Sequence, residues 1–515
     1  MKKTLYNIIC LLLCFALYGC SNGISTPAKN SQVSVVSTAS LKYTKNTINL
    51  PYALNKSLNP FTVNSMLNLM LSPLMYDSLC KPDESFKPVN ILAASVTNNG
   101  NTVTCKLVNA KFTDGSLVTA EDVQYSYALA AIPGGYFYSR VFNIATVTTQ
   151  KNNIVIFTLK VPDPLFANML DVPIIKVNSD KLPQTQLIGS GRYIYNKNGN
   201  NATLVYNKNW FRKASPQVTT IQLIDMPDDS TIASSLEIGT LDYVLSDYGT
   251  GTPMSVSLGS NSINLNQIVY IGINAVNPSN SALTDPHVRK AISLIINRKE
   301  LVKDVFSSHA IPTVLPFNPS WDLAPKVSDI EFVAEIDKAK SELALAGYNS
   351  KDKSGVYTKT EGGVTTTLSF TILVNKDDNL RLVAAEKIGN YLKNSGFNIS
   401  MNEVDFASYT SAIQTSAFDM YLGELKLTNN MDLSPFYTIG STPSFGIQPN
   451  SAFYTALSAY NNNSAKFADA VTAFKNDTPF IPICYKIGSV SFPHVFFTNI
   501  VATNHDIFYN IENWK

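Results

Sequence analysis

The chain has 515 residues, of which 45% are hydrophobic and 15% are charged, with 40 Lys and Arg residues against 38 Asp and Glu residues. This length allows two or three domains, each with a sizeable core. The nearly balanced charge argues against nucleic acid as a partner, because binding to phosphates needs a basic surface. Because charged residues are sparse and Tyr, Asn and Ser are frequent, neutral hydrogen bonding is expected to dominate the surface and any pocket.

The N-terminus has the pattern of an export signal. Two lysines precede an uncharged run, Ile8–Tyr18, which is too short to cross a hydrocarbon layer of about 30 Å. Residues 1–19 are therefore predicted to be a signal peptide. The sequence Leu17-Tyr18-Gly19-Cys20 resembles a bacterial lipobox, in which Cys20 receives a lipid after cleavage. The alternative is an ordinary secretory signal that happens to contain a cysteine.

The segment that follows is predicted to be a flexible tether. Residues 20–45 are rich in Ser, Thr and Asn and have too few large apolar residues to build a core. Loss of the signal would leave 38 of the 40 basic residues against 38 acidic residues, which is a charge near zero. No later run reaches the roughly 18 apolar residues of a membrane span. We therefore expect a lipid-anchored protein on the extracytoplasmic face of a cell membrane, such as a Gram-positive surface.

Of the six cysteines, three lie within or directly after the signal, and Cys80, Cys105 and Cys484 remain. An odd number at wide spacing does not make a disulfide framework. The three are predicted to be small buried hydrophobic residues. One pair could still form a bridge, and the sequence does not choose which.

Strand-like and helix-like segments alternate along the first half of the chain. Residues 102–108 alternate between polar and apolar like a half-buried strand, and a Thr-Asp-Gly turn follows. A helix is predicted to begin after Thr119, which can cap it, with Asp122 three residues later. Further strands are predicted at 193–195 and 202–206, before a helix at 230–238 that ends at a glycine.

The second half continues the same alternation. A short apolar run, 267–273, predicts a buried strand, and 285–302 predicts one amphipathic helix. A further helix is expected at 336–345. A β-α-β unit is then predicted, with a strand, a helix and a strand at 368–374, 380–394 and 398–404. Interleaved elements of this kind indicate an α/β protein.

Several short segments, in this order, resemble the bacterial extracellular solute-binding proteins that include oligopeptide, dipeptide and nickel receptors. The resemblance covers the chain from about residue 48 to the C-terminus. It is strongest around the Lys-Phe-Thr-Asp-Gly turn and the helix start that follows it. The segments that carry it are Leu58-Asn59-Pro60, Leu74–Leu79, Lys111–Gly115, Thr119–Val123, Gly189–Tyr193, Asn207–Trp210, Asp285–Ala291 and Ala339–Tyr348.

The resemblance implies a two-lobed periplasmic-binding-protein-like α/β fold of the large cluster C type, with a hinge of two strands. Lobe I would comprise residues 46–60, 176–268 and 480–515, with a variable subdomain inserted at 61–175. Lobe II would comprise residues 269–479. The implied function is capture of a solute, foremost an oligopeptide, and its delivery to the permease and ATPase subunits of an ABC importer. No cofactor is expected. The protein is expected to be a monomer.

The strongest local candidate for ligand contact is the strand-like segment 419–426. Residues two apart on a strand share a face, so Glu424 and Lys426 are expected to point together toward the cleft. In peptide-binding relatives an Asp nearby pairs with the ligand amine, and Asp432 is the closest match. Asn274 should lie where the chain crosses between lobes. The alternatives are a solvated Glu424–Lys426 pair and a turn-forming Asn274.

Three further groups are predicted near the cleft. The first opens a helix at the cleft edge, the second follows a Gly-Gly turn and could floor a pocket, and the third ends a strand near the hinge. For their aromatic residues, packing in the core or at the rim is the alternative. The three groups are Asn64-Ser65-Met66, Tyr136-Phe137-Tyr138 and Ser246-Asp247-Tyr248.

Other functional classes find less support. The chain has no Gly-x-Ser-x-Gly elbow, no His-Glu-x-x-His motif and no phosphate-binding loop, which argues against an enzyme or an ATPase. Its four histidines are not at metal-ligand spacing, so no metal site is predicted. A nickel chelate or a sugar could still be the ligand. A receptor for a peptide pheromone, which reports to a membrane partner, would share the fold and the anchor.

Overall fold

The computed structural model describes residues 45–226, 229–246, 258–448 and 451–515. The predicted signal, Cys20 and nearly all of the tether lie outside the described residues. So do Asp247 and Tyr248. Over the part of the chain that is described, no helix combines the length and the hydrophobicity needed to span a membrane.

The first sheet is built from strands of the chain's beginning and middle. Its order is β1-β10-β9-β8, with β1 parallel to β10 and the other pairs antiparallel. Alternate residues of β1 are buried, as the two-residue period of a strand requires. The C-terminal segment packs into the same core, where Trp514 is buried. The strands are β1 (Thr47–Tyr52), β8 (Tyr193–Asn198), β9 (Asn201–Tyr206) and β10 (Thr220–Asp225).

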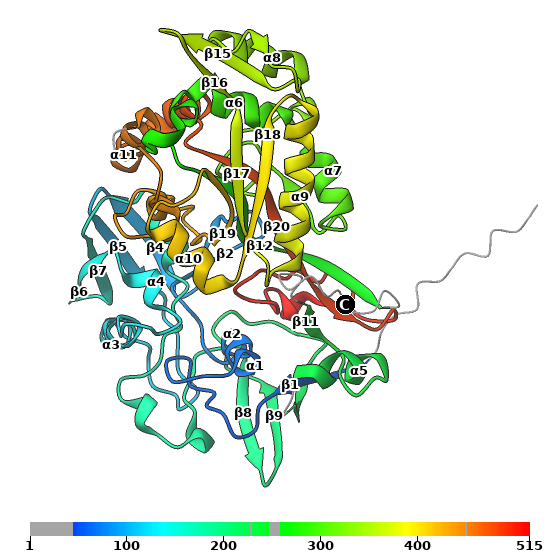
Figure 1. Ribbon diagram of the computed structural model, residues 1–515. Helices are drawn as coiled ribbons and strands as arrows, with labels where there is room; N and C mark the ends of the chain where they lie inside the picture. The colour runs from blue at the N-terminus through cyan, green and yellow to red at the C-terminus, as the bar shows by residue number, and fades with distance from the viewer. Residues whose placement is uncertain (1–44, 227–228, 247–257, 449–450) are drawn as a thin grey trace, which may run out of the picture. The chain divides into compact units, whose positions relative to one another are not determined.

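A second sheet lies between β1 and β8 in sequence and has its own core. Its antiparallel order is β4-β5-β7-β6, and helix α3 packs against β6 and β7 (Figure 1). Thr119 and Asp122 form the predicted capping box at the start of α3. Cys80 and Cys105 are free and buried in this core. The elements are β4 (Ala93–Asn99), β5 (Thr102–Leu107), β6 (Ile144–Gln150), β7 (Ile154–Leu159) and α3 (Ala120–Ala130). The same part of the chain contains helices α1 (Met66–Met70), α2 (Ser72–Met75) and α4 (Tyr138–Val141), and a separate two-stranded sheet of β2 (Cys80–Pro82) and β3 (Pro88–Asn90).

The third and largest sheet has the order β11-β20-β12-β19-β17-β18, and β13 also pairs with β20. The predicted β-α-β unit is confirmed, since β17 and β18 are parallel and helix α9 connects them. The strands are β11 (Val244–Ser246), β12 (Gly259–Ile273), β13 (Ala310–Pro312), β17 (Ser369–Asn375), β18 (Asn398–Val404), β19 (Met420–Lys426) and β20 (Phe480–Phe492). A small separate sheet holds β14 (Ser350–Lys351), β15 (Tyr357–Glu361) and β16 (Val364–Thr367).

Helices cover this sheet, and one of them differs from the prediction. The prediction of a single helix at 285–302 is wrong, because the helix ends at Ile296, where the backbone is extended with a ψ of 117°. Asn297 then caps a second helix by accepting a hydrogen bond from the Glu300 N–H. The helices are α5 (Ile232–Glu237), α6 (Pro286–Ile295), α7 (Arg298–Asp304), α8 (Ile336–Leu345), α9 (Asn379–Asn394), α10 (Phe406–Gln414), α11 (Ala452–Asn462) and α12 (Phe467–Asp477).

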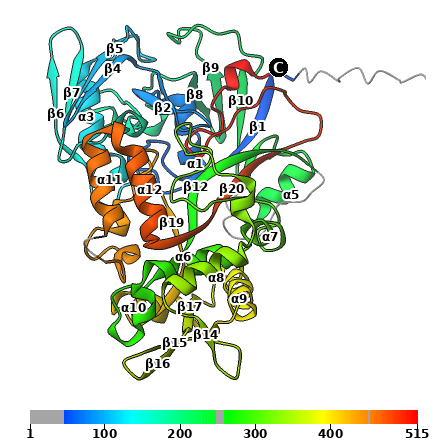
Figure 2. The same cartoon turned by 90° about the horizontal axis from the view of Figure 1, so that it is seen from above.

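Two long strands, β12 and β20, run side by side from one core to another (Figures 1 and 2). Ile263 of β12 packs in the core of the first sheet, whereas Val269 packs in the core of the large sheet. The pairing register shifts between Asn264 and Ile268, and Asn266 in that interval has a φ of 51°. The strand predicted at 267–273 is therefore only the second half of β12.

Candidate functional site

A cavity of about 780 Å³ is the candidate ligand site. Its walls come from helices α1 and α2, the loop after β1, the C-terminal segment 503–508, and strands β11, β12 and β19 of the large sheet, the last two through Leu265, Gln267 and Lys426. Ligand pockets of about 300 to 1,000 Å³ hold drug-sized molecules. Much of the wall is apolar, with contributions from Met66, Leu67, Met70, Phe137, Met226 and Leu265.

One buried amide fixes the wall formed by α1 and the loop after β1. The Asn68 side chain donates hydrogen bonds to the carbonyls of Ala53, Lys56 and Ser57 and accepts one from the Ala53 N–H at 2.8 Å. Asn68 is buried, so these bonds satisfy polar groups that water does not reach. The loop and the helix are thereby held together as one surface.

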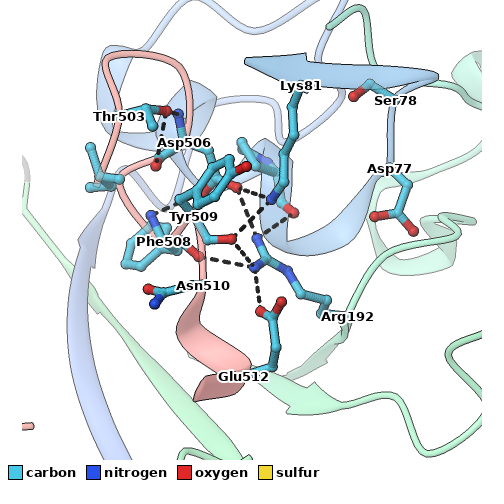
Figure 3. A network of polar contacts seen from close by, with 12 residues as sticks. Asp77, Ser78, Lys81, Arg192, Thr503, Asp506, Phe508, Tyr509, Asn510 and Glu512 are labelled. Carbon is cyan, nitrogen blue, oxygen red and sulfur yellow. Dashed lines mark hydrogen bonds and ion pairs between the residues drawn. The ribbon is translucent and has the colours of Figure 1, made fainter. Parts of the chain in front are cut away.

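An ionic network (Figure 3) includes two residues of the cavity wall, Lys81 and Asp506. The Asp506 carboxylate accepts from Lys81 Nζ at 2.8 Å and from Arg192 Nη2 at 3.0 Å. Arg192 Nη1 also donates to Glu512 Oε2 at 2.8 Å and to the Phe508 carbonyl at 2.9 Å. Burial opposes the charged carboxylate, but Lys81 and Arg192 hold the pKa of Asp506 below its ordinary value. The network thus ties the C-terminal segment to the rest of the wall.

Asp77 is a second acid on the cavity wall and stands apart from this network in Figure 3. Its Oδ2 accepts a hydrogen bond from Trp210 Nε1 at 3.0 Å. Burial raises the pKa of Asp77 to about 6, despite the lowering effects of Trp210 and Arg192. Near that pH the carboxyl group is divided between its neutral and charged forms.

The structure brings six of the predicted residues together around the cavity. They come from α1 and the residue pair before it, from the turn before α4, and from the end of β19. Tyr138 begins α4 and is 40% exposed, and it does not line the cavity. Ser246 ends β11, where it pairs with Ser489. The six are Asn64, Ser65, Met66, Tyr136, Phe137 and Lys426.

Three other predicted residues have side chains bound to the protein itself. Asn274 is buried and donates to the carbonyls of Ser416 and Phe418. Glu424 contacts Gln267 and forms an ion pair with the buried Lys486. Asp432 accepts from the N–H and the hydroxyl of Ser434. A ligand contact for any of these residues stays a prediction.

Sequence reasoning missed much of the polar wall, since it did not select Asp77, Lys81, Arg140, Asp171, His505 or Asp506. The one available signal was the segment Leu74–Leu79, which contains Asp77 and carries part of the family resemblance. The others come from segments far apart in sequence. Among the described residues, no group of three His, Cys, Asp or Glu side chains is arranged to hold a metal ion.

Comparisons with known proteins agree with this architecture. The family model described as bacterial extracellular solute-binding proteins, family 5 middle, matches residues 87–446. The oligopeptide-binding protein AppA of Bacillus subtilis (strain 168) is 25% identical over 370 residues, 67% of this chain and 66% of AppA. The chain thus spans slightly less than two thirds of that curated relative.

Solved structures resemble nearly the whole chain. AppA from Bacillus subtilis, in complex with a nonapeptide, has a TM-score of 0.58 and 21% identity, covering 92% of this chain and 99% of AppA. The periplasmic murein tripeptide-binding protein MppA, in an unliganded open form, has a TM-score of 0.75 and 19% identity over 90% and 97%. A nickel ABC transporter structure from Bacillus halodurans has a TM-score of 0.73 and 18% identity over 90% and 98%. These likenesses establish a two-lobed α/β fold, as predicted.

Proposed function

Because the chain belongs to family 5 of the bacterial extracellular solute-binding proteins, we propose that it captures a short oligopeptide in the cavity beside α1. The family consists of substrate-binding proteins and is not a class of enzymes. The peptide would then pass to the permease of an ABC importer, with ATP hydrolysed by separate subunits. The oligopeptide-binding relative AppA supports the choice of ligand.

The observation that carries the proposal is the mixed character of the cavity wall. Methionines at three places, Met66, Met70 and Met226, offer flexible side chains that adapt to different apolar groups. Scattered polar residues, such as Asn64 and Gln267, can pair with a peptide main chain. Pairing of this kind is needed, since a buried polar group without a partner costs about 1 to 3 kcal/mol.

We also propose that the protein is anchored to a membrane by a lipid. A lipid on Cys20 would hold the protein at the extracytoplasmic face of the membrane, as on a Gram-positive surface, and the segment after it would act as a tether. The lipobox-like sequence around Cys20 and the composition of residues 20–45 support this arrangement. The proposal includes a monomeric protein.

Native mass spectrometry of the protein, purified without refolding, tests the ligand. Sequencing of the released molecules should identify short peptides. Met66→Trp, which fills the cavity beside α1, should lower peptide occupancy. Leu345→Trp is a matched control, because Leu345 is 68% exposed on α8, and it should bind as the unmodified protein does. Release of a sugar, of a nickel chelate or of one dedicated peptide signal would contradict the proposed ligand. Equal peptide occupancy in the two variants would show that the ligand does not bind in the cavity beside α1.

A further inference from the structure

Four side chains from distant parts of the chain meet at one edge of the cavity. Arg140 of α4 donates from Nε to Asp171 at 3.2 Å and from Nη2 to His505 Nδ1 at 2.9 Å. His505 Nε2 contacts Asn429 Oδ1, and Asn429 Nδ2 lies 3.4 Å from Asp171 Oδ2. The Arg140, Asp171 and His505 side chains are each at most 10% exposed, and all three line the cavity.

The chemistry of these partners decides where the His505 proton sits. A guanidinium group has only N–H donors, so His505 Nδ1 must accept the bond from Arg140. A neutral imidazole with an accepting Nδ1 carries its proton on Nε2, which then donates to the Asn429 carbonyl oxygen. The arrangement therefore requires neutral His505. A second proton, on Nδ1, would face the Arg140 N–H group and remove the bond between them.

The segment that provides Asn429 also contacts the irregular part of β12. The Leu427 N–H donates to the Asn266 carbonyl at 2.9 Å, and Asn266 Nδ2 donates to the Thr428 carbonyl at 3.0 Å. Asn266 is the residue with a φ of 51° where the register of β12 shifts. The short segment 427–429 thus joins the point where β12 passes between two cores to the edge of the cavity.

We propose that Arg140, Asp171, His505 and Asn429 form a latch, which holds segment 427–430 against the cavity wall at neutral pH and opens when His505 takes up a proton. The latch as a conformational device is independent of the ligand. Its consequence, retention of the ligand at neutral pH and release in acid, rests on the proposed function.

The charges around His505 support this direction. Burial, followed by the positive charges of Arg140 and Lys426, holds the pKa of His505 well below its ordinary value. Asp171 Oδ2, 3.6 Å from Nδ1, opposes them, but it already accepts from Arg140 and Asn429. In an open latch the pKa of His505 would return toward about 6.5. The closed latch is therefore fully favoured above that pH and loses stability as the pH falls below it.

A second titrating group in the same contact acts in the opposite direction. Asp163 Oδ2 accepts from Asn430 Nδ2 at 2.7 Å, and burial raises the pKa of Asp163 to about 6, with Asp432 adding to the rise. Its contribution is greatest when the carboxyl group is protonated and is lost as the pH rises through about 6. The Asp163→Asn variant removes this opposing response and should make the effect of His505 larger.

Pulsed electron resonance distances in the ligand-free protein test the latch without any ligand. Spin labels would be attached through Lys208→Cys, after β9, and Lys353→Cys, between β14 and β15, since both lysines are exposed. The three native cysteines in the described part of the chain are buried. We expect one distance at about pH 7.5 and an additional, longer one at about pH 5.

Variants distinguish the latch from a general effect of acid. His505→Gln keeps a donor for Asn429 but does not titrate, so its distance should stay unchanged at the lower pH. Asn429→Ala should give the longer distance at both pH values. His494→Gln changes an exposed histidine and should respond as the parent does. A parent protein that does not respond, or a His505→Gln variant that responds fully, would overturn the proposal. Neither outcome would affect the search for co-purified peptides.

Discussion

Arg192, directly before β8, donates to Asp506 of the C-terminal segment at 3.0 Å, and both side chains are almost fully buried. The two residues are 314 positions apart in the chain. A buried ion pair contributes little over an apolar pair of the same shape, but loss of one partner leaves an uncompensated charge. The pair is therefore a place where a single substitution has a large effect.

Asp506→Asn should lower the free energy of unfolding by about 3 to 5 kcal/mol, because it removes the buried carboxylate that Lys81 and Arg192 share and leaves Glu512 as the only acid bound to Arg192 among the described residues. Urea unfolding of the two proteins measures the difference. Asp469→Asn is the control, since the Asp469–Lys466 pair is more than half exposed and should matter by about 1 kcal/mol or less. Equal effects of the two substitutions would contradict the role of burial.

The raised pKa of Asp77 should make the stability of the protein depend on pH. Its pKa is about 6 in the folded protein and about 3.9 in an unfolded chain, so its stabilising contribution exists at low pH and is lost as the pH rises through about 6. Asp77→Asn keeps an acceptor for Trp210 and does not titrate. Between about pH 4 and about pH 8 the stability difference should shift by about 2 to 3 kcal/mol in favour of the variant. A difference that stays constant across this range would show that Asp77 titrates normally.

Asn68→Ala should weaken ligand binding and lower stability by about 1 to 3 kcal/mol, because it removes the buried amide that donates to the carbonyls of Ala53, Lys56 and Ser57. Isothermal titration with a peptide identified by mass spectrometry, together with thermal unfolding, measures both effects. Asn64→Ala changes an exposed residue of the same wall and should leave stability within about 0.5 kcal/mol. If both variants unfold alike, Asn68 does not hold the loop to α1.

Cys20→Ser should release the protein from the membrane, because the proposed lipid would have no attachment site. Metabolic labelling with an alkyne-bearing fatty acid, followed by fractionation, tests this in cells. The parent should be labelled and found with membranes, whereas the variant should be unlabelled and found in the medium or the soluble fraction. Cys484→Ser, at a buried cysteine, is the control and should keep the label. An unlabelled parent would favour an ordinary secretory signal.

Local signals in the sequence predicted local structure well. The capping residues Thr119 and Asp122 located the start of α3, and the apolar pattern of 368–404 predicted a parallel β-α-β unit. The helix break at Ile296 was missed because apolar residues continue at helical spacing on both sides of it. Periodicity reports which face is buried and does not report a single residue with extended backbone.

The candidate site was only partly predictable, for a different reason. Tyr136, Phe137 and Met66 were found because apolar residues beside turns or helix starts are natural pocket walls. The contact between Arg140 and His505 spans 365 positions, and no pattern along the chain reveals which distant segments meet. Glu424 lies on a strand, as predicted. Its ion-pair partner Lys486 comes from β20, and the alternation of residues along one strand does not reveal which other strand lies nearby.

The C-terminal segment has a consequence for biosynthesis. Trp514 is buried in the core of the first sheet, the Thr498 N–H donates to the Lys515 carbonyl at 2.7 Å, and residues 503–508 form part of the cavity wall. The core that begins with β1 therefore stays incomplete until the chain has been synthesised as far as Trp514. A product terminated before residue 503 would lack Trp514 from that core and residues 503–508 from the cavity wall.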